Sequence, residues 1–121
     1  MEQIFISKTK TTPNVIYNDN TNILSFIGRC YPENSDSVFK KLDDWVTNFD
    51  DDILIFKIQL EYFNTASSKH IYSMIKKFID KDIKEFKVQW VYEIDDTDSL
   101  ETGTFFQDGL DIKFDFIPIT I

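Results

Sequence analysis

Apolar and polar residues recur along this chain in patterns that predict both helices and strands. Two stretches, Asp36–Asp50 and Ala66–Ile79, carry apolar side chains at intervals of three and four residues, which is the spacing of an amphipathic helix. Asn34 or Ser35 would cap the start of the first helix. Between the two helices, Ile53–Leu60 is apolar on both faces in its first half, which is typical of a strand covered on both sides of a sheet.

The remaining stretches complete one series of strands and helices. Residues 95–109 form a weaker, acidic helix candidate. Short apolar or alternating stretches predict the other strands at residues 4–7, 14–17, 23–27, 86–92 and 112–116. The predicted order is therefore β-β-β-α-β-α-β-α-β. It describes an α/β fold with a mixed β-sheet and helices packed against it, antiparallel at its start and parallel where helices separate the strands.

The composition is that of one globular domain spanning residues 1–121. Hydrophobic residues make up 42% of the chain and aromatic residues 16%, whereas a disordered chain would be poor in both. A chain of this length buries about two-thirds of the surface that its unfolded form exposes, which is enough for one hydrophobic core. With three glycines and three prolines there is no linker and no low-complexity tract, so we expect a single domain.

The net charge narrows the range of partners. The chain has 13 Lys and Arg residues against 21 Asp and Glu residues, which gives a formal charge of −8. Because nucleic-acid binding depends on basic residues that neutralise phosphates, and because anionic membranes repel acidic proteins, we expect neither partner. The amino terminus lacks a basic start followed by an apolar stretch, and no apolar run approaches the roughly 20 residues of a membrane span. We therefore expect a cytoplasmic protein.

Candidate catalytic and metal-binding residues are few. Cys30 and His70 are the chain's one cysteine and one histidine, which excludes an intramolecular disulfide and a metal site rich in Cys or His. The carboxylates of residues 50–52 and 95–101 lack the spacing of a calcium loop, and the glycines are isolated rather than grouped as in a phosphate-binding loop. We therefore expect no catalytic residues, no cofactor and no metal.

The segment of residues 61–69 carries the strongest functional signal. It leads from the carboxyl end of the most apolar strand into an amphipathic helix, and this is the edge of α/β sheets at which binding sites occur. Thr65, Ser67 and Ser68 place three hydroxyls where that helix begins, and a helix amino terminus stabilises an anionic group. Two interpretations stay open. Either Asn64 or Thr65 only caps the helix, or one hydroxyl is phosphorylated and a partner protein detects the added charge.

Three segments of the chain resemble the SiaC family of bacterial regulatory phosphoproteins. They are residues 60–69 (LEYFNTASSK), residues 31–35 (YPENS) and residues 90–93 (WVYE), the last followed by an acidic stretch. The resemblance covers nearly the whole chain. It implies a fold similar to STAS domains, the class that includes anti-sigma factor antagonists, and it implies that Thr65 is the phosphorylation site.

The resemblance also implies protein partners. Members of the family are modified by a serine/threonine kinase with a histidine-kinase-like fold and are dephosphorylated by a PP2C-type phosphatase. The unphosphorylated form binds and activates a diguanylate cyclase, which makes cyclic diguanylate. Ala66 stands where the family motif commonly has serine, so a hydroxyl next to Thr65 is missing here. We expect Thr65 to be the switch, with Ser67 and Ser68 as fallback sites, and we expect phosphorylation to weaken partner binding.

We expect the partner to dock where two strands lead into helices. The predicted partner-binding residues are Tyr31, Glu33, Asn34, Ser35, Tyr62, Asn64 and Lys69. The leading hypothesis is a non-enzymatic phosphorylation switch that controls a diguanylate cyclase by binding it. The alternatives are an anti-sigma-antagonist-like partner switch with a different output, a small acidic enzyme using groups near Thr65 and His70, and a scaffold in which Thr65 is only a cap.

Overall fold

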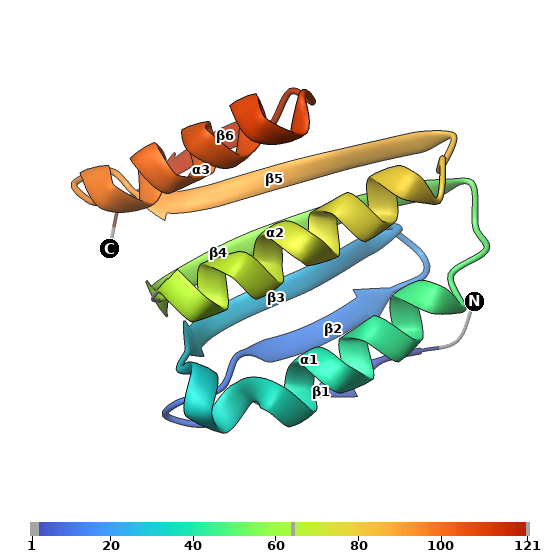
Figure 1. The fold of residues 1–121 in the computed structure, drawn as a ribbon, viewed down its shortest axis with the longest axis horizontal. Coiled ribbons are helices and arrows are strands. Elements are labelled where there is room, and N and C mark those ends of the chain that lie inside the picture. The colour runs from blue at the N-terminus through green and yellow to red at the C-terminus, as the bar shows by residue number, and fades with distance from the viewer. Residues whose placement is uncertain (1–2, 64, 121) are drawn as a thin grey trace.

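A computed structural model describes the backbone of residues 3–63 and 65–120, and all their side chains except those of residues 32–35, 62, 63, 65 and 66. These residues form a six-stranded sheet with three helices packed against it (Figure 1). The strands are β1 (Phe5–Ile6), β2 (Asn14–Asn18), β3 (Ile23–Cys30), β4 (Ile53–Phe63), β5 (Glu85–Glu93) and β6 (Asp115–Ile119). The helices are α1 (Pro32–Thr47), α2 (Thr65–Asp80) and α3 (Thr97–Leu110). The predicted α/β class and the predicted order of elements are both confirmed.

The strands lie in the sheet in the order in which they occur along the chain. β1, β2 and β3 pair antiparallel, whereas β3, β4, β5 and β6 are parallel and are joined by the three helices. Strand–helix–strand connections are right-handed in nearly all proteins, and here each one leads to the next strand in the same direction across the sheet. The three helices therefore lie on the same face, and each begins near the edge at which the parallel strands end (Figure 1).

The β4 strand shows how the two faces of the sheet differ. Leu54, Phe56 and Ile58 point into the core beneath the helices and are at most 1% exposed. The side chains that alternate with them lie on the opposite face. There Ile53 is 40% exposed and Ile55 is half-buried. The prediction that this strand is covered on both faces is wrong, because every crossover places its helix on the first face.

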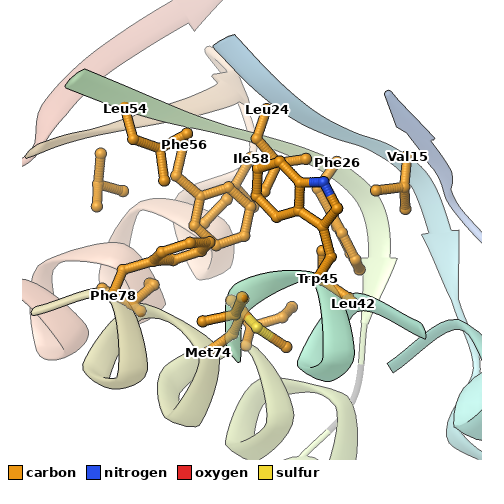
Figure 2. Packing of buried hydrophobic residues seen from close by; sticks show 14 of the residues in the cluster. Val15, Leu24, Phe26, Leu42, Trp45, Leu54, Phe56, Ile58, Met74 and Phe78 are labelled. Atoms are coloured by element: carbon orange, nitrogen blue, oxygen red, sulfur yellow. The ribbon is translucent and has the colours of Figure 1, made fainter. Parts of the chain in front are cut away.

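Aromatic rings fill much of the space between the helices and the sheet (Figure 2). The ring centroids of Phe56 in β4 and Phe78 in α2 are 5.5 Å apart, with the ring planes at 70°. The ring of Trp45 in α1 lies 4.9 Å from that of Tyr17 in β2 and 6.3 Å from that of Phe78. Such ring pairs stabilise a core by about 0.5–1.5 kcal/mol each beyond the burial of their surface. They join α1 and α2 to each other and to β2 and β4.

Tyr17 brings a hydroxyl to the margin of this core. Its O–H donates to a carboxylate oxygen of Asp51 at 3.4 Å and accepts from the side-chain amide of Asn22 at 3.4 Å. Burial raises the pKa of Tyr17 and the negative charge of Asp51 raises it further, whereas the bond from Asn22 acts in the opposite direction. The tyrosine is therefore held in its neutral, donating form.

The first helix begins earlier than predicted. Tyr31 is the N-cap residue of α1 and makes no side-chain capping bond, and Pro32 occupies the first helical turn. Proline suits this place because its backbone angle is already helical and it has no N–H that would need a partner. The prediction that Asn34 or Ser35 caps the helix is wrong, since both residues lie within α1.

The last strand lies later in the chain than predicted. The α3 helix continues to Leu110, one residue beyond the predicted end. The N–H of Phe114 then donates to the side-chain oxygen of Gln107 at 2.8 Å, so this N–H is used outside the sheet. β6 therefore begins at Asp115 rather than at Ile112.

The third helix packs very closely against the sheet at Gly103. Trp90 of β5 is 1% exposed, and its indole N–H donates to the carbonyl oxygen of Ser99 at 3.0 Å. A β-carbon on Gly103 would lie 2.8 Å from a ring carbon of Phe116 and 2.8 Å from the indole nitrogen of Trp90. Glycine thus allows α3 to approach the two aromatic rings that the last two strands place beneath it.

We expect Gly103→Ala to destabilise the protein, although alanine is the better helix former. Overpacking of this kind typically lowers the free energy of unfolding by about 1–3 kcal/mol. Phe105→Ala is the matched control, because Phe105 lies on the same helix, is 74% exposed and should change that free energy by less than about 0.5 kcal/mol. Urea unfolding measures both variants. A Gly103→Ala variant as stable as the parent would contradict the close approach.

Candidate functional site

The two predicted functional segments meet at one edge of the sheet. β3 ends at Cys30 and β4 ends at Phe63, and these two residues are paired in the sheet. Tyr31 follows β3 and is the N-cap residue of α1, while Thr65 is the first residue of α2. Because the strands are parallel, the starts of α1 and α2 lie at the same edge (Figure 1, left). The structure therefore brings together residues that are more than 30 positions apart in the sequence.

Part of the predicted site lies outside the described residues. Asn64 is not described, and neither are the side chains of Glu33, Asn34, Ser35, Tyr62 and Thr65. Among the predicted residues that are described, Tyr31 is half-buried and Lys69 is exposed on the first turns of α2. Thr65 is the first residue of α2, one residue ahead of the predicted start at Ala66. The roles predicted for all these side chains stay predictions.

Ser67 joins the start of α2 to the end of β3. Its side chain is fully buried, and its hydroxyl donates to the carbonyl oxygen of Cys30 at 2.9 Å. A kinase cannot reach this hydroxyl while the first turn of α2 is packed in this way. Ser68 is half-buried and is the more accessible of the two fallback sites. The arrangement therefore favours a structural role for Ser67.

His70 and Cys30, the two residues considered for catalysis, both make contacts that stabilise the fold. The ring of His70 stacks on that of Phe39 in α1, with centroids 4.5 Å apart and planes at 15°. Cys30 is fully buried, and its carbonyl oxygen accepts the bond from Ser67. His70 thus helps to hold α1 against α2, and these contacts give no support to a catalytic pair.

The residues that the structure describes form neither a metal-binding cluster nor a helix suited to cross a membrane. No group of three or more His, Cys, Asp and Glu side chains in this part of the chain could hold a metal ion. None of the helices in the described ranges combines the length and the apolar composition that crossing a membrane requires.

A basic cleft that sequence reasoning missed lies beside this edge. It has a volume of about 570 Å³ and is lined by Lys8, Thr9, Lys10, Gly28, Arg29 and Glu61. Gly28 pairs with Leu60 and Arg29 with Tyr62, so Glu61 is the extra residue of a β-bulge. The bulge places Glu61 beside Arg29, with a guanidinium N–H to carboxylate distance of 3.4 Å. The sequence does contain a Lys-Thr-Lys triplet, but only the strand pairing brings it next to Arg29.

The family comparison and the comparison with solved structures both lead to SiaC. The chain matches the family model described as SiaC family regulatory phosphoprotein over residues 6–119. A search of curated proteins finds no match. The structure of SiaC of Pseudomonas aeruginosa is similar, with 25% identity, a TM-score of 0.79 and 100% of each chain covered. Apo-SiaC from the same organism is 27% identical with a TM-score of 0.73, and 98% of each chain is covered.

A third similar structure contains a partner protein. It is the diguanylate cyclase SiaD in complex with its activator SiaC from Pseudomonas aeruginosa. The matched chain is 24% identical with a TM-score of 0.80, and the match covers 98% of this chain and 99% of that one. At this level of identity the likeness describes the fold.

We expect Ser67→Ala to loosen the start of α2. The substitution leaves the buried carbonyl of Cys30 without the donor at 2.9 Å and should lower the free energy of unfolding by about 1–2 kcal/mol. Ser73→Ala, on an exposed position of the same helix, is the matched control and should have little effect. Hydrogen exchange of the amides in the first turn of α2 should speed up in the Ser67 variant alone. Unchanged exchange would show that the bond does not hold this turn.

Proposed function

The chain belongs to the SiaC family of regulatory phosphoproteins, and we propose that it is a non-enzymatic switch whose binding to a protein partner is controlled by phosphorylation of Thr65. The partner that we propose is a diguanylate cyclase, so that the output is cyclic diguanylate synthesis in the cytoplasm. The observation that carries the proposal is the position of Thr65 as the first residue of α2, at the edge where both predicted segments meet. The structure of the relative SiaC with the cyclase SiaD supports the choice of partner.

The start of a helix is a favourable place for a reversible phosphate. The first backbone N–H groups of α2 have no partners within the helix, and the helix dipole is positive at this end. A phosphate carrying about −1.5 to −2 charges can accept bonds from these groups without unfolding the domain. Ser67 and the stacked pair of Phe39 and His70 hold the same turn against the rest of the protein. Modification should therefore change the surface and preserve the fold.

The surface that changes is the predicted partner-binding surface. It comprises Tyr31, Glu33, Asn34, Ser35, Tyr62, Asn64 and Lys69, around the starts of α1 and α2. A phosphate buried in a packed interface loses hydration and takes up space, so we propose that the unphosphorylated form is the one that binds. A serine/threonine kinase and a PP2C-type phosphatase would set the balance between the two forms. Ala66 reduces the hydroxyl groups available to either enzyme next to Thr65.

Two other functions have less support than the proposed one. An anti-sigma-antagonist-like partner switch would use the same phosphorylation site with a different output, and identification of the co-purifying partner separates the two. A small acidic enzyme would have to act through groups near Thr65 and His70, whose described surroundings are structural. Turnover of a generic phosphoester by the purified protein alone would favour the enzyme.

We expect Thr65→Ala to bind the cyclase like the parent and to escape the kinase. Thr65→Asp should weaken binding, and the phosphorylated protein should bind about a hundredfold more weakly, since a loss of a few kcal/mol has that effect on a dissociation constant. The aspartate acts less strongly because a carboxylate carries less charge than a phosphate. Ser73→Asp adds the same charge to an exposed position further along α2 and serves as the control. Calorimetric titration of the cyclase measures all three variants.

The location of the phosphate is tested separately. Phosphopeptide mapping of protein purified from native cells should place it on Thr65. A phosphate found only on Ser68 would remove Thr65 as the switch, as would Thr65→Ala and Thr65→Asp variants that both bind the cyclase like the parent.

A further inference from the structure

The basic cleft stands out against the charge of the whole protein. Among the described residues that line the cleft, Lys8, Lys10 and Arg29 are basic and Glu61 alone is acidic, so this lining is positive in a chain of formal charge −8. Lys8 and Lys10 are exposed, and no described residue forms an ion pair with either ammonium group. Interactions between exposed charges are screened beyond about 8 Å at physiological ionic strength. A ligand within the cleft therefore experiences the local cations more strongly than the distant carboxylates.

The ion pair of Arg29 and Glu61 in the cleft is easily exchanged. The guanidinium Nε of Arg29 is 3.4 Å from the nearest carboxylate oxygen of Glu61, and the two side chains are 55% and 54% exposed. Exposed ion pairs of this kind contribute about 0–1 kcal/mol to the free energy of unfolding. A second carboxylate that approaches Arg29 in the bidentate geometry would form stronger bonds than the present pair. Glu61 thus occupies a position that an incoming acidic group can take.

The loop that carries the two lysines is well ordered by its own hydrogen bonds. The hydroxyl oxygen of Thr9 accepts from the backbone N–H groups of Thr11 and Thr12 at 3.2 and 3.0 Å, and it lies 2.6 Å from the hydroxyl of Thr12. The N–H of Tyr31 donates to the carbonyl oxygen of Thr11 at 2.9 Å. This last bond joins the lysine loop to the start of α1. The backbone from which the lysines extend is therefore preorganised, which lowers the entropic cost of binding.

We propose that this cleft binds a carboxylate-rich segment of the protein partner. The inference rests on the proposed function, because it assigns the cleft to the same partner that the starts of α1 and α2 recognise. Arg29 is separated from the N-cap residue Tyr31 by Cys30 alone, so the cleft lies next to the start of α1, one of the two segments of the predicted docking surface. The cleft accounts for how a strongly acidic protein holds an acidic segment, which its overall charge would repel.

The cleft also supplies a physical reason for the direction of the switch. Thr65 follows Phe63 by two residues, and Phe63 pairs with Cys30, the neighbour of Arg29. A phosphate on Thr65 adds negative charge at the edge where the acidic segment approaches. Like charges repel, so the phosphate opposes the segment and the unmodified protein binds more tightly.

Charge-reversal variants test the cleft in the complex with the proposed partner, the diguanylate cyclase encoded in the same native cells. The double variant Lys8→Glu/Lys10→Glu and the single variant Arg29→Glu should each raise the dissociation constant by about tenfold or more. This loss of affinity should shrink as salt is added. Glu61→Gln removes the competing carboxylate and should tighten binding by about twofold to fivefold. Lys84→Glu is the matched control, because Lys84 is exposed and directly precedes β5, at the opposite edge of the sheet. It should change the dissociation constant by less than about twofold.

Each outcome separates the cleft from the proposed function. If the unmodified parent forms no complex with the cyclase, the proposed function fails and the inference fails with it. If the complex forms but the lysine and arginine variants bind like the parent, the cleft is not the contact. If Lys84→Glu weakens binding as much as the cleft variants do, overall charge is the cause and the cleft is again excluded.

Carbodiimide coupling of the parent complex gives a second measurement that needs no variant to fold. This reagent joins amines to carboxylates that are in direct contact. Mass spectrometry should find Lys8 or Lys10 joined to Asp or Glu residues of the cyclase. Coupling that occurs only through lysines outside the cleft would overturn the inference.

Discussion

The right-handed crossover is the constraint on which the rest of this structure depends. Four parallel strands follow one another across the sheet in chain order, so each helix has to cross in the same sense and arrive on the same face. The amino ends of the helices then gather at the edge where the parallel strands end (Figure 1). Tyr31 and Thr65 meet there for this reason alone, since no feature of either residue requires the other.

The aromatic layer beneath the helices makes that edge a stable platform. Rings from α1 and α2 pack on rings from β2 and β4, and Trp90 with Gly103 fixes α3 in a comparable way at the other side of the sheet. Ser67 and His70 extend this packing to the first turns of α2. A domain held in this way can accept a charged group at a helix start without unfolding, so that only the charge and shape of its surface change. This property suits a protein that signals by being bound.

Charge is distributed unevenly over the same edge. The net charge of −8 describes the molecule at a distance, whereas a partner in contact meets individual side chains within a screening length. A single inserted residue in β4, Glu61, shifts the register and places its carboxylate against Arg29. The lysine loop is fastened next to them through the backbone of Tyr31. The bulge and the loop together create a local positive site that the overall composition conceals.

The second face of the sheet shows the limit of reasoning from composition. β4 is apolar enough at its start to suggest cover on both sides, and yet Ile53 is 40% exposed. Apolar content reports how much surface a segment could bury. It does not report where the neighbouring elements are, because that depends on strand order and on the handedness of the connections.

The sequence by itself determined the kinds of element and their order, because apolar periodicity reflects which side of a segment is buried. α2 is the clearest case: the pattern predicted residues 66–79 and the helix spans Thr65–Asp80. Segment ends were less well determined, since they depend on single residues such as Pro32, which starts α1 ahead of Asn34 and Ser35. The position of Thr65 at the start of a helix could also be predicted, because the signals that begin a helix act locally. Only the tertiary structure decided that Ser67 is buried against Cys30, and that Lys8, Lys10 and Arg29 share one cleft. Those relations depend on strand pairing between residues far apart in the chain, about which local periodicity carries no information.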